Sequence, residues 1–478
     1  MLLDIRSHSP KRLMIPMADK GASGTPVAGI VDRIRGSIFS GPLVPRSDAE
    51  RRRYLLKNLV LHFRPATVAE PTLKFSLTWG LGGMAAVLIA IQFLTGLLLK
   101  IVYVPTPQGA YNSIQVLQDE ILFGGLVRNL HHWSANLLVL IIFLHWMRVF
   151  FTGAFQPPRQ FNWVIGFGLL LLVLGANFTG YLLPYDQLGY WAVTVSSGML
   201  EYIPWIGHHL QVLLQGGPEI GPATLRIFFA IHTAILPIGL AVLMAFHFWR
   251  IRKAGGLVIP RSVENPTVET PKRVTTIPHL LLREAVTALV LIAAVFLLAA
   301  LFAAPLAGPA NPGLSPNPTK APWYFAGLQE MLLHLHPTFA VLVVPMLLAI
   351  GVLLIPYLRY DSYTGGIWFV SRKGRRTAAL AAIAGFVITP LLILLDEWFV
   401  EPGRWMPELS PLVRNGLLPF LGLIGILAGF GLILKRRFAV TRNEAVQAAV
   451  VLITTAFVVL TIFGIWFRGE AMTVIWSG

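Results

Sequence analysis

The chain of 478 residues contains no cysteine. This absence excludes disulfide bonds, thiolate-bound zinc, iron–sulfur clusters ligated by this chain and any haem attached to it through a thioether bond. Any iron that the chain holds must therefore be bound by histidine or by another ligand that is not a thiolate.

Charged side chains are also scarce. Only 13% of the residues are charged, compared with about 25% in an average soluble domain. Hydrophobic residues make up 55% of the chain and the mean hydropathy is +0.68, which indicates that most of the chain lies in lipid. The net charge of +16 does not predict a nucleic-acid partner, because the basic residues are concentrated in alternate loops between apolar segments.

Nine apolar segments are long enough to cross, as helices, a hydrocarbon layer about 30 Å thick. We therefore expect an all-α integral membrane protein with transmembrane helices at residues 76–104, 121–152, 162–183, 223–250, 281–304, 338–358, 376–398, 415–435 and 445–467. Lysine and arginine are absent from the loops after the first and third helices and frequent before the first helix and after the fourth, sixth and eighth. By the positive-inside rule, the amino terminus is cytoplasmic and the carboxyl terminus lies outside, as expected for a bacterial inner-membrane protein.

Four histidines recur at nearly the same interval on two of these helices. His131 and His145 are fourteen residues apart, and His232 and His247 are fifteen apart, which corresponds to about four helical turns or roughly 21–23 Å of rise. Two such helices side by side form two levels, each with one imidazole from each helix. A lone histidine is usually a hydrogen-bonded core residue, but histidine in a membrane segment is costly and the spacing occurs twice. We therefore expect a four-helix bundle with two non-covalent b-type haems, bound by His131 with His232 near the outer face and by His145 with His247 near the cytoplasmic face.

Two pairs of glycines repeat the same interval on the neighbouring helices. Gly82 and Gly96 lie in the first helix and Gly166 and Gly180 in the third, and each pair is fourteen residues apart. Because glycine weakens a helix, its repetition at this interval indicates the close approach of a bulky group such as haem. Tight packing between helices is the alternative explanation.

The rest of the chain is organised around this bundle. Residues 1–73 are expected to form a cytoplasmic arm without a cleavable signal, because the first thirty residues lack a continuous apolar core. A helix on the membrane surface is predicted from the spacing of Ile30, Ile34 and Ile38, with a solvated arm as the alternative for the first 25 residues. Beyond the arm we expect the di-haem domain at 74–255, an outer loop with helices five and six at 256–360, and three further transmembrane helices at 361–478.

Three stretches of the sequence resemble cytochrome b of the quinol:cytochrome c oxidoreductases (bc complexes). They are LHHWSANLLVLIIFLHWMRVFFTGAF at 130–155, FTGYLLPYDQLGYWAVTVSSGMLEYIPWIG at 178–207 and FFAIHTAILPIGLAVLMAFHFWRIRKAGG at 228–256. The HxWSA pattern and the fifteen-residue gap are more similar to the chloroplast-type branch (bf complex), in which the haem helices and the later helices are often separate subunits. Here both parts are fused in one chain. The likeness covers about residues 28–360, and the ninth helix departs from the eight that are usual in fused members.

The resemblance implies a quinol-oxidising, proton-releasing oxidoreductase that works within a complex. Quinol oxidised near the outer face would give one electron to a Rieske-type iron–sulfur protein, which serves a c-type cytochrome, and the other through both haems to a quinone at the cytoplasmic side. The resemblance also implies a homodimer in membrane lipid. A di-haem anchor of a peripheral dehydrogenase with one quinone site is the alternative, and a transporter with structural histidines and no haem is a third interpretation.

The resemblance also suggests roles for basic residues. Arg128 and Arg148 match positions near haem propionates, although His132 stands where relatives often carry arginine. Arg252 and Lys253 match basic residues near the inner quinone pocket, but cytoplasmic arginines and lysines also anchor helices.

One family feature is excluded outright. The chloroplast branch attaches an additional haem through a cysteine at the position of Gly80, so this attachment cannot occur here. The absence of cysteine excludes only the covalent attachment and not a third haem held without a covalent bond.

The outer quinol pocket is expected between residues 181–207 and 317–336. Both segments belong to loops that are poor in lysine and arginine and that lie outside by the charge rule. From the family match, we expect Tyr181, Pro322 and Tyr324 near the mouth of this pocket.

The outer loop departs from the family at the residue that would accept a proton. The family motif Pro-Glu-Trp-Tyr corresponds to Ala-Pro-Trp-Tyr, so Pro322 precedes Trp323 where relatives have glutamate. Proline cannot act as a general base. Glu330 is the next acidic residue, and we expect desolvation to raise its pKa and make it the acceptor, unless it only pairs at a helix end. Further candidates are, in order, Glu201, Asp186 and His334.

Overall fold

The computed structural model describes residues 46–57, 64–260, 271–361, 365–400 and 402–475. The chain forms two units, residues 1–62 and 63–478. In the first unit, α2 (Asp48–Lys57) carries two acidic residues in its first turn, where the helix dipole favours negative charge. The surface helix predicted from Ile30, Ile34 and Ile38 lies outside the described residues.

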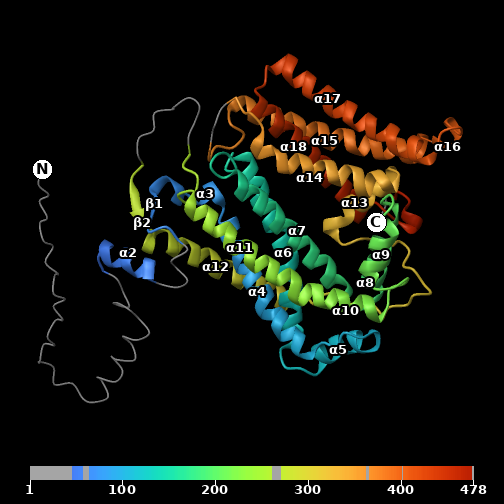
Figure 1. Cartoon of the computed structure of the whole chain (residues 1–478), viewed down its shortest axis with the longest axis horizontal. Coiled ribbons are helices and arrows are strands. Elements are labelled where there is room, and N and C mark those ends of the chain that lie inside the picture. The colour runs from blue at the N-terminus through green and yellow to red at the C-terminus, as the bar shows by residue number, and fades with distance from the viewer. Residues whose placement is uncertain (1–45, 58–63, 261–270, 362–364, 401, 476–478) are drawn as a thin grey trace, which may run out of the picture. The chain divides into compact units, whose positions relative to one another are not determined.

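Within the described residues, nine helices are long and apolar enough to cross a membrane (Figure 1). They are α4 (Leu81–Val102), α6 (Gly124–Phe151), α7 (Gln160–Leu182), the continuous helix of α10 (Pro222–Ala230), η4 (Ile231–Ile235) and α11 (Leu236–Lys253), α12 (Thr276–Leu301), the helix of η5 (Thr338–Val343), α14 (Val344–Leu354) and η6 (Ile355–Tyr357), α15 (Arg372–Phe399), the helix of η7 (Val413–Leu417) and α17 (Leu418–Phe438), and α18 (Arg442–Trp466). The predicted fold class and all nine predicted helices are confirmed, and their ends differ from the prediction by a few residues.

Three of these helices contain a π-helical turn, and a proline follows each turn. The turns η4, η5 and η7 precede Pro237, Pro345 and Pro419, respectively. Proline has no amide hydrogen to donate, and its ring collides with the carbonyl group four residues earlier. A π turn contains one more residue than an α turn and relieves this collision. Each helix therefore continues past its proline.

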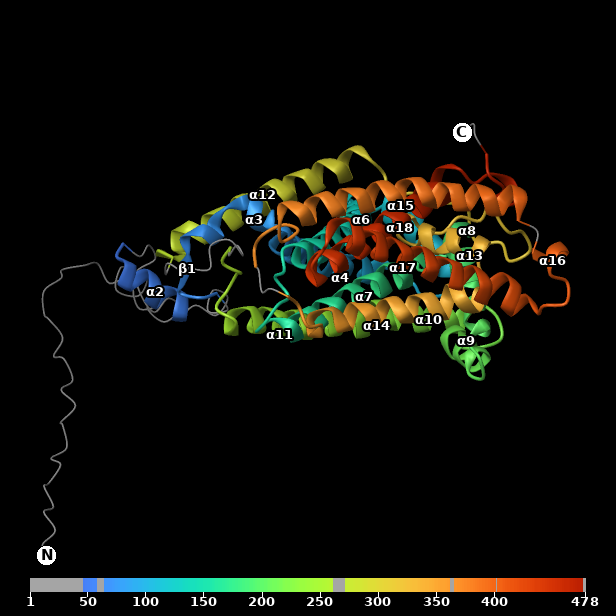
Figure 2. The same ribbon diagram turned by 90° about the horizontal axis from the view of Figure 1, so that it is seen from above.

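The first four transmembrane helices and α12 share one apolar core. Helix α4 packs on α6, α7 packs on α11, and α12 covers α4 and α6. Figure 2 shows these helices running side by side along the length of the bundle. Buried aliphatic side chains fill the space between them, among them Leu88, Leu138, Ile142, Val173, Leu240 and Val295.

Short helices lie at one end of the bundle and a strand pair at the other (Figure 1). The first group, which we call the loop end, comprises α5 (Pro107–Asp119), α8 (Gln187–Gly198), η3 (Met199–Tyr202), α9 (Gly207–Gln215) and α13 (Trp323–His334). At the opposite strand end, β1 (Thr67–Ala69) pairs antiparallel with β2 (Arg273–Thr275), and η2 (Glu70–Leu73) and α3 (Phe75–Thr78) lead into α4. This pairing ties residues of the predicted arm to the loop after the fourth helix.

The ninth helix, α18, packs against α13 and α15. It begins with a capping box in which Thr441 and Glu444 bond each other's backbone amide groups. Glycines allow α18 and α13 to approach closely, because a β-carbon on Gly464 would lie 2.8 Å from the carbonyl oxygen of Ala326 and one on Gly327 would lie 2.6 Å from the hydroxyl of Thr461. The ninth helix thus supports the short helix that connects the fifth and sixth.

Candidate functional site

The four histidines of the bundle meet in two pairs at two depths. Near the loop end, the ring centres of His131 on α6 and His232 in η4 lie 6.2 Å apart. Nearer the strand end, His145 on α6 and His247 on α11 are close enough to interact electrostatically. The structure therefore brings together the residues that were predicted to form each pair.

The π turn η4 explains why one interval is fourteen residues and the other fifteen. His232 lies inside η4 (Ile231–Ile235), so one extra residue is taken up between His232 and His247. The fifteen-residue interval then spans the same four turns as the fourteen residues from His131 to His145, which lie in one uninterrupted helix. Both imidazoles of the fourth helix thereby reach the depths of their partners.

Each of the four repeated glycines lies beside one histidine. Measured from a β-carbon built on the glycine to Cε1 of the ring, the distances are 3.1 Å for Gly82 with His145, 3.3 Å for Gly96 with His131, 3.7 Å for Gly166 with His247 and 2.6 Å for Gly180 with His232. At three of the four positions a side chain would crowd the ring. The glycines give the four imidazole rings room, and the close approach of haem that their spacing predicts stays a prediction.

Two threonines orient the imidazoles near the loop end. Thr95 donates its hydroxyl hydrogen to the carbonyl oxygen of Ile91, so its oxygen can accept a hydrogen bond from Nδ1 of His131 at 2.9 Å. Thr179 likewise lies 3.2 Å from Nδ1 of His232, which also lies 3.0 Å from the carbonyl oxygen of Ala176. A proton held on Nδ1 leaves Nε2 unprotonated and free to bind a metal ion. The sequence reasoning missed both threonines, although each one directly precedes a repeated glycine.

The two arginines that flank the histidines differ in their surroundings. Arg148, near His145, donates from Nε to the carbonyl oxygen of Leu77 at 2.8 Å, while its buried Nη2 has no hydrogen-bond partner among the described residues. An acidic group at this position would satisfy it. Arg128 instead donates to the carbonyl oxygens of Ala304 and Pro305 at 2.8 and 2.6 Å. Arg128 therefore fixes the loop that follows α12.

A cavity of about 250 Å³ opens at the loop end. It lies between the two segments that were predicted to enclose the outer pocket. Its lining combines apolar side chains with a few polar ones, namely Phe178, Ala192, Val195, Ser196, Met199, Thr319, Lys320, Ala321, Phe325, Leu328, Gln329, Leu332 and Val341. None of these residues is an aspartate, a glutamate or a histidine.

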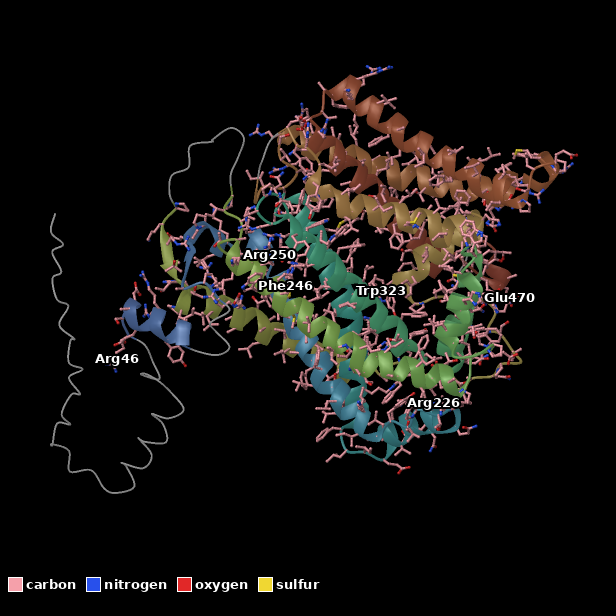
Figure 3. The ribbon with its side chains drawn as sticks, in the orientation of Figure 1. Arg46, Arg226, Phe246, Arg250, Trp323 and Glu470 are labelled. Carbon is pink, nitrogen blue, oxygen red and sulfur yellow. The ribbon has the colours of Figure 1, made fainter. Side chains whose placement is uncertain are left out.

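Of the Ala-Pro-Trp-Tyr stretch, only Ala321 lines this cavity. Pro322, Tyr324 and Tyr181 are not among the lining residues, and their place near the mouth of a quinol pocket stays a prediction. Tyr324 instead packs against the core of the bundle, and burial raises its pKa. Trp323, labelled in Figure 3, donates its indole hydrogen to the side-chain oxygen of Asn136 on α6 at 2.7 Å. The stretch thus attaches the start of α13 to the histidine helix.

Glu330 does not face the cavity. The cavity is lined by Phe325, Leu328, Gln329 and Leu332 of α13, whereas Glu330 is completely buried on the face that packs against α18. Its carboxylate accepts hydrogen bonds from Arg468 at 2.6 and 3.0 Å.

The expectation that desolvation makes the pKa of Glu330 high is therefore wrong. Burial alone would raise the pKa, but the hydrogen bonds and charges of His334 and Arg468 hold it below its ordinary value of 4.5. A carboxylate stabilised in this way is a poor proton acceptor near neutral pH. The sequence offered no sign of the partner, because Arg468 lies 138 residues further along the chain.

The other proposed proton acceptors also lie outside the cavity lining. Asp186 caps α8 by accepting a hydrogen bond from the amide of Gly189 at 2.8 Å. Its other carboxylate oxygen accepts a hydrogen bond from the amide of Ala307, in the loop after α12, at 3.0 Å. Glu201 is largely exposed, with one oxygen 3.8 Å from His208. His334 bonds Glu330 and Asp396 on the far side of α13. Asp186 and His334 therefore have structural partners that account for their positions.

The basic residues after His247 lie at the strand end of α11. Lys253 places its ammonium group 5.3 Å from the ring centre of Trp249, and Arg252 is in the same last helical turn. Figure 3 labels Phe246 and Arg250 one turn apart on this helix and Arg226 at the opposite end of the continuous helix. Arg250 also lies 5.7 Å from the ring of Phe161. Such contacts anchor a helix end in the interface between membrane and water.

The fold and the site together define a class of protein. It is a helical membrane protein in which two pairs of facing histidines are stacked within a bundle, with a cavity at one end.

Comparison with known proteins identifies the family. Residues 68–255 match the family model for cytochrome b/b6/petB. The cytochrome b6 of Heliobacterium mobile is 40% identical over 185 residues, which are 39% of this chain and 87% of that protein. The cytochrome b6 of Acaryochloris marina is 45% identical over 175 residues, or 37% of this chain and 81% of that protein. The chain belongs to the cytochrome b/b6 family and is an integral membrane protein.

A solved structure resembles this chain over the later helices as well. A chain of the structure named hyperthermophilic respiratory Complex III superimposes with a TM-score of 0.62 at 23% sequence identity, covering 91% of this chain and 98% of that one. At this identity the likeness shows a shared fold, and it extends that fold well beyond the four histidine helices.

Proposed function

We propose that the chain is the cytochrome b subunit of a quinol:cytochrome c oxidoreductase and binds two b-type haems. His131 and His232 would hold one haem and His145 and His247 the other. In this proposal a quinol is oxidised in the loop-end cavity, and quinone is bound near Arg252 and Lys253. The partners would be a Rieske-type iron–sulfur protein, a c-type cytochrome and a second copy of the same chain.

The ring separation at the loop-end pair carries the haem assignment. Two imidazoles that bind one metal ion place their nitrogens about 4 Å apart, because each bond is about 2 Å long, and their ring centres therefore lie about 6 Å apart. The distance of 6.2 Å between His131 and His232 fits one iron between the rings. The flanking glycines leave space for a flat macrocycle, and the unpartnered Nη2 of Arg148 suits a propionate.

The chain's own residues position these groups. Bound haem supplies one-electron chemistry, while Thr95 and Thr179 fix the protonation of the outer imidazoles and the four glycines set the space around them. At the cavity, Phe178 and Phe325 meet edge to face at 6.1 Å and offer aromatic surface to a quinol ring. Ser196, Lys320 and Gln329 are the polar groups that can orient its oxygens.

Substitution of the histidines tests the haem assignment. Changing His131 or His232 to alanine should remove one b-type haem per chain and leave the other, whereas His145→Ala or His247→Ala should remove the second. Haem content and reduced-minus-oxidised spectra measure both outcomes. His132→Asn is the matched control, since His132 is adjacent to His131 but bonds Asn136, and it should keep both haems. Unchanged haem content in all four alanine variants would refute the assignment.

The oxidoreductase role is tested on the purified protein. A Rieske-type iron–sulfur protein and a c-type cytochrome should copurify, and duroquinol should reduce the haems of the complex. Purification with a peripheral dehydrogenase and no iron–sulfur protein would instead indicate a di-haem anchor.

A further inference from the structure

We propose that Arg468, which follows the ninth transmembrane helix, is a positioning residue for the loop-end cavity. This inference rests on the proposed function, because it assigns the ninth helix a part in quinol binding. The residues involved are the segment 465–471, which we call the clamp, and the segment 317–334, which forms one wall of the cavity.

The centre of the clamp is a buried ionic cluster. The side chain of Arg468 is 1% exposed and that of Glu330 is fully buried. Arg468 also donates from Nη1 to Glu397 on α15 at 2.9 Å and to the carbonyl oxygen of Met472 at 2.8 Å. One guanidinium therefore joins α13, α15 and the segment after α18. Because the planar guanidinium group donates its hydrogen bonds in fixed directions, it constrains both the distance and the orientation of its partners.

His334 extends the cluster toward the surface. Its two ring nitrogens lie 3.2 Å from Glu330 and 2.6 Å from Asp396, whose side chain is 37% exposed. Both contacts are hydrogen bonds when the ring is protonated. Two residues of α13 one turn apart are thus held by charged groups from α15 and from the segment after α18.

Two further contacts hold the other end of the cavity wall. Lys320, which lines the cavity, donates to the carbonyl oxygen of Ile465 at the end of α18 at 2.8 Å. The amide of Ala471 donates to the side-chain oxygen of Asn317 at 2.6 Å. The clamp therefore contacts the cavity wall on both sides of the Ala-Pro-Trp-Tyr stretch, at Asn317 and Lys320 before it and at Glu330 after it.

The contacts of Glu330 and His334 lie on the opposite side of α13 from the cavity. Leu328, Gln329 and Leu332 face the cavity, whereas Glu330 and His334 face the clamp. Because α13 is a rigid helix, fixing one face sets the position of the other. Arg468 therefore acts on the bound quinol through α13 and without touching it.

Variants of Arg468 test this role in the intact complex with duroquinol as substrate. Arg468→Met leaves α13 without its partner, so the KM for duroquinol should rise by about tenfold or more, while haem content and spectra stay at the parent level. Arg442→Met is the matched control, because Arg442 lies at the other end of the same helix and bonds the carbonyl oxygen of Arg359. Its KM should equal that of the parent.

Two more variants separate positioning from other roles. Arg468→Lys keeps the charge but loses the two-pronged contact, so its KM should lie between those of the parent and Arg468→Met. If Arg468→Met does not accumulate in the membrane, the KM of Arg468→Lys alone tests the inference. Glu330→Gln keeps only one acceptor oxygen for Arg468 and so also loses the two-pronged contact. Its KM should therefore rise as in Arg468→Lys, while kcat at saturating duroquinol and its pH profile should match the parent. A proton-accepting role for Glu330 would instead lower kcat and shift that profile.

A covalent rescue gives a direct readout of position. Because the chain has no cysteine, Asn317→Cys with Ala471→Cys would introduce its only two thiols, at residues that are in contact. In the Arg468→Lys background, oxidation of this pair should restore the parent KM and reduction should abolish the rescue. Variants that unfold at lower temperature but keep the parent KM would overturn the inference. A parent complex whose haems duroquinol cannot reduce would overturn the proposed function itself, and the role of Arg468 with it.

Discussion

At the scale of single residues, the glycines beside the histidines differ in the room that they leave. A β-carbon on Gly180 would lie 2.6 Å from Cε1 of His232, whereas one on Gly166 would lie 3.7 Å from Cε1 of His247. The first distance forces the ring to move and the second is an ordinary contact. Gly180 and Gly166, both on α7, can therefore serve as a test position and its control.

We predict that Gly180→Ala lowers the content of the loop-end haem and that Gly166→Ala leaves both haems in place. A ligand ring that is displaced by a few tenths of an ångström or more loses its alignment with the iron. Haem quantification and difference spectra of the two variants measure the effect. Equal haem content in both would show that the rings adjust freely to an added methyl group.

The charged residues around Arg468 predict a dependence of stability on pH. Burial lowers the pKa of His334, but the hydrogen bonds and charges of Asp396 and Glu330 outweigh it and raise the pKa from 6.5 to about 9. The stability that His334 contributes is complete below pH 6.5 and is lost as pH rises through about 9. The pKa of Glu330 is shifted downward, so its contribution is present above pH 4.5 and is lost in more acidic solution.

Thermal unfolding of the purified protein should therefore become easier as the pH rises from about 6 to about 10, by on the order of 2 kcal/mol. His334→Asn should remove most of this slope. His209→Asn, at an exposed histidine of α9, is the control and should retain it. A slope that persists unchanged in His334→Asn would assign the pH dependence to other groups.

The sequence predicted single residues well where they repeat and poorly where they act with a distant partner. The histidines and glycines were found because their intervals recur on neighbouring helices. Glu330 was misjudged because its environment is set by Arg468, and no local pattern links residues 138 positions apart. The arginine-to-carbonyl contacts of Arg128 were equally invisible, since they depend on where the loop after α12 folds back.

At the scale of elements, helix α8 lines the cavity only from Ala192 onward. Ala192, Val195 and Ser196 line the cavity, whereas Leu188 does not and is 40% exposed. A large side chain at Ala192 should occupy the space that we assign to quinol, and one at Leu188, a turn earlier on the same side of the helix and outside the cavity lining, should not.

We predict that Ala192→Trp raises the KM for duroquinol by about tenfold or more and preserves both haems. Leu188→Trp on the same helix should behave like the parent. Steady-state kinetics with haem spectra on each variant provide the measurement. Parent kinetics in Ala192→Trp would place quinol oxidation elsewhere.

Element boundaries followed from the sequence, but local helix geometry did not. Long apolar segments predict helices because lipid leaves backbone groups no other hydrogen-bond partner. The three π turns were not predicted, even though each is followed by a proline two residues later. The one in the fourth helix also explains the unequal histidine intervals. Packing of α18 on α13 could not be predicted, because it depends on contacts between segments far apart in the chain.

At the scale of the whole molecule, the nine candidate transmembrane helices found in the described residues are odd in number, so we expect the first and the last of them to leave the chain on opposite sides of the membrane. The charge distribution predicts that the strand end is cytoplasmic and the loop end is outside. We therefore predict that alkaline phosphatase fused after residue 475 is active and that the same enzyme fused after residue 440 is inactive. Activity in the reverse order would invert the orientation, and activity in both would remove one of the nine helices from the membrane.

The arrangement of the clamp has a consequence for biosynthesis. A ribosome that has produced the first four transmembrane helices has already produced all four histidines, so the two haems of the proposed function could be inserted early. Glu330 follows, but its partner Arg468 emerges 138 residues later. Until then, α13 lacks the contacts that fix it. If haem and quinol bind as we propose, a nascent or truncated subunit would hold both haems and still not accept quinol, so electrons would enter only after the ninth helix is in the membrane.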